Sequence, residues 1–500
     1  MASSRMKWLA MIKDTLAPGV SMQDKFPPKA VGVRLAEARA LFEDSRVGDA
    51  EALLRELTAR EPTCEGAAML LAEVLRSQGR LSAAAKAVLD VCEANEFEPL
   101  LCLRAVGFVQ QCDRHATAAQ ICEGALGHAT VPPELLVLAG HIARESGDFE
   151  TARARYVAAL DAGVDLDRHH VLGALANTRR YAGAGDADIA RFARHFADTR
   201  YSPRSRASAG FALAKVQNDL ADYASAAATL RRANAMVQTV SSWNAAAWRA
   251  FVAERRHGAI ASINGMPDHD FIPVFVLGLP RSGTTLTATL LARASGARDR
   301  GEFRALRFIA SRLASGGHLG STTAMAEAAN LYRMLAVQDD APARWYIDQD
   351  PLNFRYLDIA AAMFPQARVI HLRRDPRDTA LSLWSQDFAH PDVAFAYDFE
   401  DMAAYMEGHD ALMHHWKKAL RIPIHELDYE ALVTDTDATL ARLGDFIGAP
   451  VDKPGHSHES VPVQSASVWQ ARQPVYKTSV GRWRHYAPYV PELAQFGERH

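Results

Sequence analysis

The chain has 500 residues, of which 49% are hydrophobic and 23% are charged, and its formal net charge is −3. These values are ordinary for a soluble globular protein with two or three domains. The nearly neutral balance provides no overall basic field for nucleic acid or an anionic membrane, so we expect neither as a partner. The five cysteines form no CxxC pair, which argues against a zinc site and against a disulfide framework.

Residues 1–30 form an N-terminal segment without a signal-peptide core. Lys7 and Lys13 interrupt its apolar residues, whereas a secretory signal needs a continuous apolar stretch. No uncharged run in the chain approaches the roughly 18–20 residues of a membrane span. We therefore expect a cytoplasmic protein.

Residues 31–262 carry a helical repeat. Ala84, Ala118 and Ala152 follow one another at intervals of 34 residues, and a period of 34 with small residues at helix crossings is typical of tetratricopeptide repeats. Such helix pairs stack into a solenoid because one pair alone cannot bury its apolar face. A generic helical solenoid is the alternative. Both interpretations predict a surface that binds a protein or peptide.

Residues 263–500 change in composition. Short apolar runs at 271–279, 345–348, 367–372 and 422–427 are interpreted as strands, and the helical patterns between them include residues 284–294, 356–364 and 402–420. Alternating strands and helices predict a parallel sheet covered by helices on both faces. The expected fold is thus an N-terminal α-helical solenoid followed by a P-loop-like α/β domain.

The first apolar run leads into a glycine-rich bend and then a helix, which is the arrangement that binds a phosphate group. Gly278 and Gly283 permit tight turning, and the amides of the bend and helix start can converge on an anion. The spacing is that of the nucleotide P-loop, but Thr284 occupies the position of its lysine and Arg281 brings a positive charge into the bend. Because the missing lysine normally contacts the β- and γ-phosphates, a kinase or nucleoside triphosphatase is disfavoured. A tight turn without a ligand is the remaining alternative.

The segment HLRRDPRDTALSLW, residues 371–384, is a second candidate for anion binding. Arg374 is expected at the carboxyl end of a strand and Ser382 two turns along the next helix. Ligands of open α/β sheets bind at that edge, and arginine provides forked donors for phosphate. Helix capping by Asp375 and Pro376 explains part of the pattern but not the arginines directly after an apolar strand.

With these motifs in order, residues 271–486 resemble the sulfotransferase superfamily. The similarity is to bacterial tetratricopeptide-containing sulfotransferases and, in catalytic layout, to tyrosylprotein sulfotransferases. The resemblance implies 3′-phosphoadenosine 5′-phosphosulfate as co-substrate, a hydroxyl-bearing acceptor and no metal. It assigns the 5′-phosphosulfate to the PRSGTTL loop and the 3′-phosphate to Arg374 and Ser382. The donor-binding residues that it implies are Arg281, Ser282, Gly283, Thr284, Thr285, Arg374, Ser382, Tyr429, Ser467 and Arg482.

The resemblance also implies two catalytic residues. Glu302, 21 residues after Arg281, corresponds to the proposed base of the tyrosylprotein enzymes, and Arg281 is the candidate that stabilises the transferred group. As an alternative, Glu302 begins the next helix and favours its positive end. For Tyr429, a role as a core aromatic is an equally good explanation.

One position departs from the family pattern. Gln349, in DQDPLNF, replaces a family lysine and brings no charge to the site. The sequence therefore favours a sulfotransferase whose repeats recruit the acceptor or a partner, with the acceptor a protein tyrosine, a glycan or a small molecule. Because of Gln349, a repeat-based binding scaffold with a weakly active or inactive sulfotransferase-like domain is the alternative.

Overall fold

The computed structural model describes residues 29–258, 268–388, 391–451 and 478–497. These residues divide into two compact units. The first contains the described residues up to Ile142 together with Ala158–Ala162 and Val337–Ala341, and the second contains the rest. The division falls within two helices of the N-terminal half, α8 and α9.

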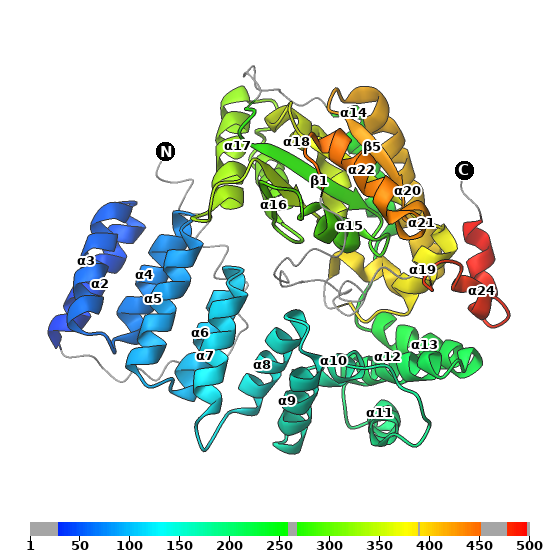
Figure 1. The fold of residues 1–500 in the computed structure, drawn as a ribbon, viewed down its shortest axis with the longest axis horizontal. Helices are drawn as coiled ribbons and strands as arrows, with labels where there is room; N and C mark the ends of the chain where they lie inside the picture. The colour runs from blue at the N-terminus through cyan, green and yellow to red at the C-terminus, as the bar shows by residue number, and fades with distance from the viewer. Residues whose placement is uncertain (1–28, 259–267, 389–390, 452–477, 498–500) are drawn as a thin grey trace. The chain divides into compact units, whose positions relative to one another are not determined.

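The first unit is built from antiparallel helix pairs (Figure 1). Ala84 and Ala118 have no exposed surface, as expected for small residues where helices cross closely. Gly79, at the turn between α4 and α5, has φ 76°, which is a conformation that glycine adopts without strain. The helices in this part of the chain are α2 (Lys29–Glu43), α3 (Val47–Arg60), α4 (Glu65–Ser77), α5 (Leu81–Ala94), α6 (Pro99–Gln111), α7 (His115–Leu126), α8 (Pro133–Glu145) and α9 (Phe149–Asp161).

Further helices of the N-terminal half belong to the second unit. The long helices α12 and α13 pack against each other, and α14 packs on α20 of the α/β part. The assignment of these helices to tetratricopeptide repeats stays a prediction, as do the boundaries at residues 31, 262 and 263. The helices are α10 (Val171–Ala176), α11 (Ala187–Ala197), α12 (Pro203–Asp219), α13 (Tyr223–Gln238) and α14 (Ala245–His257).

A parallel sheet forms the centre of the α/β part, with the strand order β2-β3-β1-β4-β5. The central strand β1 pairs with β3 on one side, where Val274 lies opposite Ile347, and with β4 on the other, where Val276 lies opposite Ile370. The strands are β1 (Ile272–Gly278), β2 (Ala297–Asp299), β3 (Trp345–Asp348), β4 (Arg368–Arg373) and β5 (Ile424–Asp428).

Helices cover both faces of this sheet (Figure 1). On one face, Val274 and Val276 belong to a core that includes Leu291 of α15 and Leu443 of α22. On the other, the ring of Phe275 lies 6.0 Å from that of Tyr332 on α17. The helices are α15 (Thr284–Leu291), α16 (Ala305–Ser315), α17 (Thr322–Val337), η1 (Pro351–Tyr356), α18 (Leu357–Met363), α19 (Pro376–Trp384), η2 (Pro391–Tyr397), α20 (Phe399–Ala419), α21 (Tyr429–Thr434), α22 (Thr436–Ile447), α24 (Trp483–Tyr486) and η3 (Pro491–Phe496).

The observed architecture confirms the fold class expected from the sequence: many helices precede an α/β domain with a parallel sheet. The four apolar runs all form strands. The edge strand β2 was not predicted, because its three residues, Ala-Arg-Asp, carry no apolar run. None of the described helices is both long and apolar enough to cross a membrane.

Candidate functional site

The phosphate loop connects β1 to α15, as the sequence predicts. The strand ends at Gly278 and the helix begins at Thr284, with Gly283 as its N-cap residue. The first amides of an α-helix have no acceptor within the helix, and the helix dipole adds partial positive charge at this end. The loop and the start of α15 therefore form a site suited to an anion.

Both glycines of the loop are required by their surroundings. Gly283 has φ 110°, and a Cβ atom there would lie 2.5 Å from the Tyr429 ring. A Cβ atom on Gly278 would lie 2.6 Å from the Leu372 carbonyl oxygen on the neighbouring strand β4. Because these distances are below any real Cβ contact, only glycine lets the loop lie this close to β4 and Tyr429.

Arg281 occupies the bend in the left-handed conformation, with φ 73°. A residue with a Cβ atom adopts this conformation at a cost of roughly 1–3 kcal/mol, and such residues cluster at functional sites. Its Nε donates to the Ser382 hydroxyl oxygen on α19 at 3.0 Å. The structure thus brings together two predicted donor-binding residues that are far apart in the sequence.

Arg374 lies beside the same bend. Its Nη1 donates to the Arg281 carbonyl oxygen and its Nη2 to the Ser479 carbonyl oxygen, both at 2.8 Å. Its guanidinium carbon lies 4.8 Å from the centre of the Tyr429 ring. The preceding residue, Arg373, is instead at the β5 side of β4, 3.8 Å from the carboxylates of Glu426 and Asp428. Of the two consecutive arginines, Arg374 is therefore the one at the phosphate loop.

Two buried polar atoms at this place have no hydrogen-bond partner among the residues that the structure describes. They are the Ser282 hydroxyl oxygen and Arg374 Nε. A buried polar group without a partner is costly, by about 1–3 kcal/mol. The anionic groups of a bound ligand would accept hydrogen bonds from these atoms, so the residues present fit a phosphate-bearing ligand. Thr284 and Thr285, in the first turn of α15, are buried next to them.

Helix α19 begins as the sequence suggested. Asp375 is its N-cap, and its carboxylate accepts a hydrogen bond from the Arg377 amide at 2.8 Å, with Pro376 in the first turn. The helix then carries Ser382 to Arg281. Capping therefore does not compete with the predicted anion binding, because the capping residues differ from the predicted ligand residues Arg374 and Ser382.

Glu302 lies in a turn fixed against the end of β3. The Gly301 carbonyl oxygen accepts hydrogen bonds from the amides of Gln349 and Phe303, both at 2.9 Å. The Glu302 side chain is accessible to solvent, yet burial among protein atoms, followed by the nearby Asp350 carboxylate, raises its pKa to about 7. The carboxyl group is thus surrounded by protein atoms while it stays exposed to solvent. The charges of Arg304, Arg281 and Arg307 oppose this shift.

A carboxyl group with a pKa near neutrality can accept a proton at physiological pH. Arg281 contributes to the electrostatics of both the phosphate loop and Glu302. The arrangement therefore combines an anion site, a positive charge and a candidate base. Glu302 does not begin the next helix, because α16 begins at Ala305 with Arg304 as its N-cap. The alternative role at a helix start is therefore disfavoured.

Gln349 is buried between two aspartates at the end of β3. Its Oε1 has no hydrogen-bond partner among the described residues. Asp348 accepts a hydrogen bond from the Tyr332 hydroxyl at 2.9 Å, and burial raises the pKa of this aspartate well above its usual value. Asp350 caps η1 by accepting from the Leu352 amide at 3.0 Å. The position of the family lysine is thus close to the candidate base but contributes no cation.

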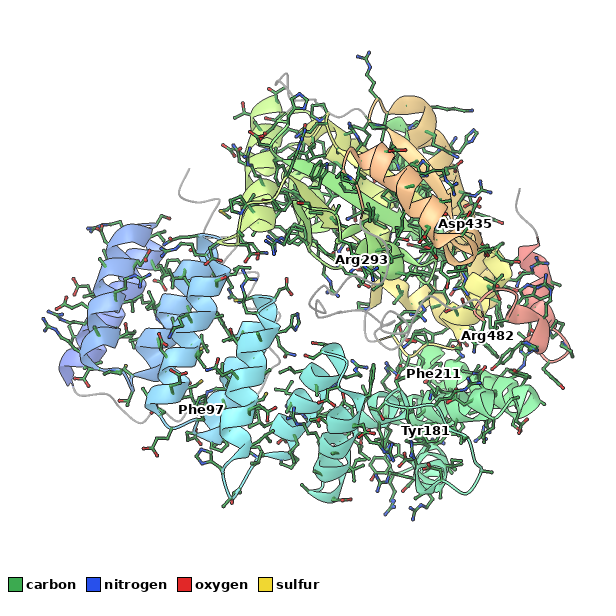
Figure 2. The ribbon with its side chains drawn as sticks, viewed as in Figure 1. Phe97, Tyr181, Phe211, Arg293, Asp435 and Arg482 are labelled. Atoms are coloured by element: carbon green, nitrogen blue, oxygen red, sulfur yellow. The ribbon has the colours of Figure 1, made fainter. Side chains whose placement is uncertain are left out.

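The remaining predicted residues belong to the C-terminal part of the chain. Tyr429 contacts the phosphate loop and Arg374, and its hydroxyl is hydrogen-bonded to the Ser479 hydroxyl at 2.7 Å. Ser467 lies outside the described residues. Arg482, labelled in Figure 2, donates from Nη2 to Asn218 Oδ1 on α12 at 3.0 Å. Its described hydrogen bond is thus to a helix and not to the phosphate loop.

Three residues near the site were not singled out by the sequence. Ser479 binds Arg374 and Tyr429, and Asp378 accepts hydrogen bonds from the amides of Gly481 and Trp483. Asn218 binds Arg482. No motif marks Asn218, because the residues that it contacts follow more than 260 positions later. Among the described residues, no group of three or more His, Cys, Asp or Glu side chains is arranged to hold a metal ion.

Residues 273–453 match the model described as the sulfotransferase family. This stretch contains β1, the phosphate loop, Glu302, Arg374, Ser382 and Tyr429.

One individual relative is similar to part of the chain. An uncharacterized protein of Aquifex aeolicus (strain VF5) is 31% identical over 317 residues, which cover 58% of this chain and 41% of that protein. The chain thus spans less than half the length of this relative.

Two solved structures are similar to part of the chain. The sulfotransferase domain from the Synechococcus PCC 7002 olefin synthase is 21% identical, covering 47% of this chain and 98% of that domain, with a TM-score of 0.34. The sulfotransferase STF1 from Mycobacterium tuberculosis H37Rv is 17% identical, covering 66% of this chain and 99% of that one, with a TM-score of 0.25. At these TM-scores, neither likeness contributes to the functional argument.

Proposed function

We propose, from the match of residues 273–453 to the model of the sulfotransferase family, that the protein transfers a sulfuryl group from 3′-phosphoadenosine 5′-phosphosulfate to a hydroxyl acceptor. The acceptor is a protein tyrosine, a glycan or a small molecule, and the N-terminal helices recruit it or a partner protein. A cytoplasmic location and the absence of a metal requirement are parts of the same proposal.

The observation that carries this proposal is the meeting of Arg281, Arg374 and Ser382 at one phosphate loop. A donor with phosphate groups at two ends needs two anion sites. The loop amides with Arg281 suit the phosphosulfate, and Arg374 with Ser382 suits the second phosphate. A lysine-containing loop, by contrast, would suit a nucleoside triphosphate.

The proposed reaction is an in-line displacement. The acceptor hydroxyl oxygen forms a bond to sulfur, while the bond from sulfur to the bridging phosphate oxygen breaks and its electron pair leaves with 3′-phosphoadenosine 5′-phosphate. Glu302 accepts the proton of the acceptor hydroxyl. Arg281 stabilises negative charge on the transferred group and the leaving phosphate.

A binding scaffold with a weakly active or inactive domain is a second candidate, and Gln349 is the observation that favours it. The amide brings no positive charge next to the reaction centre, and its Oε1 is buried without a described partner. In this case the anion site would persist while transfer would be slow.

Calorimetry with 3′-phosphoadenosine 5′-phosphate tests the donor site. We expect saturable binding with one site per chain, and no binding at high ligand concentration would refute both candidates. A transfer assay with labelled donor and separate tyrosine-peptide, glycan and small-alcohol acceptors then distinguishes them. Transfer to one of these classes supports the enzyme, whereas binding without transfer to any of them supports the scaffold.

A further inference from the structure

The C-terminal segment 478–486 is held at its middle by a single carboxylate. Asp378, buried on α19, accepts hydrogen bonds from the amides of Gly481 at 2.6 Å and Trp483 at 2.9 Å. The guanidinium group of Arg377 lies 4.1 Å from the centre of the Trp483 ring. Because Asp378 binds backbone amides, it fixes the path of the chain independently of the side chains.

The same segment is anchored a second time, on the helix α12. Arg482 Nη2 and the Tyr486 hydroxyl both donate to Asn218 Oδ1, at 3.0 and 2.9 Å. An amide oxygen has two lone pairs, so these two donors use the full capacity of that atom. Tyr486 is also buried against the ring of Tyr223 on α13, with ring centres 5.3 Å apart.

Between the anchors and the phosphate loop lies Ser479. Its carbonyl oxygen accepts from Arg374 Nη2, and its hydroxyl is bonded to the Tyr429 hydroxyl. Arg374 thus has one guanidinium nitrogen fixed by the phosphate loop and another fixed by the C-terminal segment, and its Nε has no partner among the described residues. A shift of Ser479 would remove one of the two contacts that set the direction of Nε.

We propose that Asn218 and Arg482 are positioning residues for the donor site: they anchor segment 478–486 on α12, and this segment holds Arg374 in the orientation that binds the donor. Arg482 then acts through Asn218 and does not touch the donor. This inference rests on the proposed function. It links a helix of the N-terminal half to donor affinity within the second compact unit.

A double-mutant cycle on the full chain tests the inference, with the affinity for 3′-phosphoadenosine 5′-phosphate measured by calorimetry. Asn218→Ala and Arg482→Ala should each raise Kd by about fivefold to tenfold, as expected for the loss of one or two hydrogen bonds. The Kd of the double variant should not exceed the higher of the two single-variant Kd values, since the effects of residues that act as one unit are not additive. A Kd increase in the double variant equal to the product of the single increases would show that Arg482 contacts the donor directly, and would overturn the inference.

Two further variants separate positioning from a general loss of stability. Asn218→Asp keeps an acceptor oxygen for Arg482 and Tyr486, so its Kd should be close to that of the wild type. If Asn218 had only a structural role, the charge introduced by Asn218→Asp would be no better tolerated than the Asn218→Ala substitution. Tyr486→Phe keeps the buried ring, loses one donor and should raise Kd by about twofold to fivefold. The matched control is Asn330→Ala, at an exposed position of α17, which should leave Kd unchanged.

The outcomes also distinguish this inference from the proposed function. Absence of ligand binding to the wild-type protein overturns both. Binding by the wild type together with an unchanged Kd in Asn218→Ala overturns the inference alone. With a donor-dependent transfer assay, Asn218→Ala should raise the KM for the donor more than it lowers kcat, because the anchor lies away from the transferred group.

Discussion

Arg281 Nε and the Ser382 hydroxyl oxygen lie 3.0 Å apart, although 101 residues separate them in the sequence. The contact joins the bend of the phosphate loop to the last turns of α19. It fixes the direction of the Arg281 guanidinium group while the backbone of the same residue adopts a left-handed conformation. Strain and orientation at Arg281 are thus coupled.

The coupling predicts opposite effects on activity and stability when Arg281 is replaced. Arg281→Gly should lower kcat by about 10²–10³-fold, as the loss of a preorganised charge stabilising the transition state does. The glycine variant should nevertheless be more stable than Arg281→Ala by about 1 kcal/mol, because glycine adopts φ 73° without a Cβ clash. Urea unfolding and steady-state kinetics on both variants provide the measurement. Equal stability of the two variants would show that the bend relaxes when the side chain is removed.

The raised pKa of Glu302 predicts the pH dependence of transfer. A base acts in its ionised form, so kcat/KM should rise with pH and level off above about 7. Asp350→Asn removes the second-largest cause of the raised pKa and should move the midpoint of the profile to lower pH. Glu302→Gln should lose most of the turnover but keep its affinity for 3′-phosphoadenosine 5′-phosphate. Loss of that affinity in Glu302→Gln would instead indicate a structural role.

The raised pKa of Glu302 also predicts that the stability of the folded protein falls as pH rises towards 7. Since the pKa of Glu302 is raised in the folded state above the ordinary 4.5, the folded protein binds more protons than the unfolded chain between pH 4.5 and about 7. Stability contributed by the protonated group is therefore lost as pH rises through this window. The melting temperature of Glu302→Gln should exceed that of the wild type at pH 8, with a smaller difference at pH 5. A difference in melting temperature that does not depend on pH would contradict the raised pKa of Glu302.

Gly283 provides a test of the phosphate loop itself. Gly283→Ala should abolish measurable donor binding, because φ 110° disfavours any side chain and the new Cβ atom would clash with Tyr429. Gly320→Ala is the matched control, since a Cβ atom there meets nothing within 4 Å. Calorimetry should show unchanged binding in the control. Unchanged binding in Gly283→Ala would place the anion site elsewhere.

Gln349→Lys tests whether the missing charge limits turnover. The substituted ammonium group would lie beside the carboxylate of Asp350, which favours its charged form. A positive charge added close to the transferred group should raise kcat by about fivefold to tenfold. Gln349→Met, of similar length but without a polar end, is the control and should not raise kcat. An unchanged or lower kcat in Gln349→Lys would mean that the arginines around Glu302 already supply the required charge.

Much of the sheet and of the phosphate loop could be predicted because their determinants are local. Apolar runs of a few residues define β1, β3, β4 and β5, and the two glycines with the following helix start define the loop. The short strand β2 could not be predicted, since it depends on pairing with β3 and not on its own residues. The sequence singled out Arg374, and the structure places Arg374 at the loop and Arg373 beside β5.

The sequence by itself determined that a glycine-rich loop followed by a helix start lies at the carboxyl end of a parallel strand, because turn chemistry and the apolar period act over tens of residues. Only the tertiary structure decided that Arg281, Ser382 and Arg374 meet, that Asp350 lies close enough to raise the pKa of Glu302, and that Asn218 anchors Arg482. These relationships join segments separated by about fifty to more than 260 residues. They depend on how helices pack around the sheet, which no local pattern specifies.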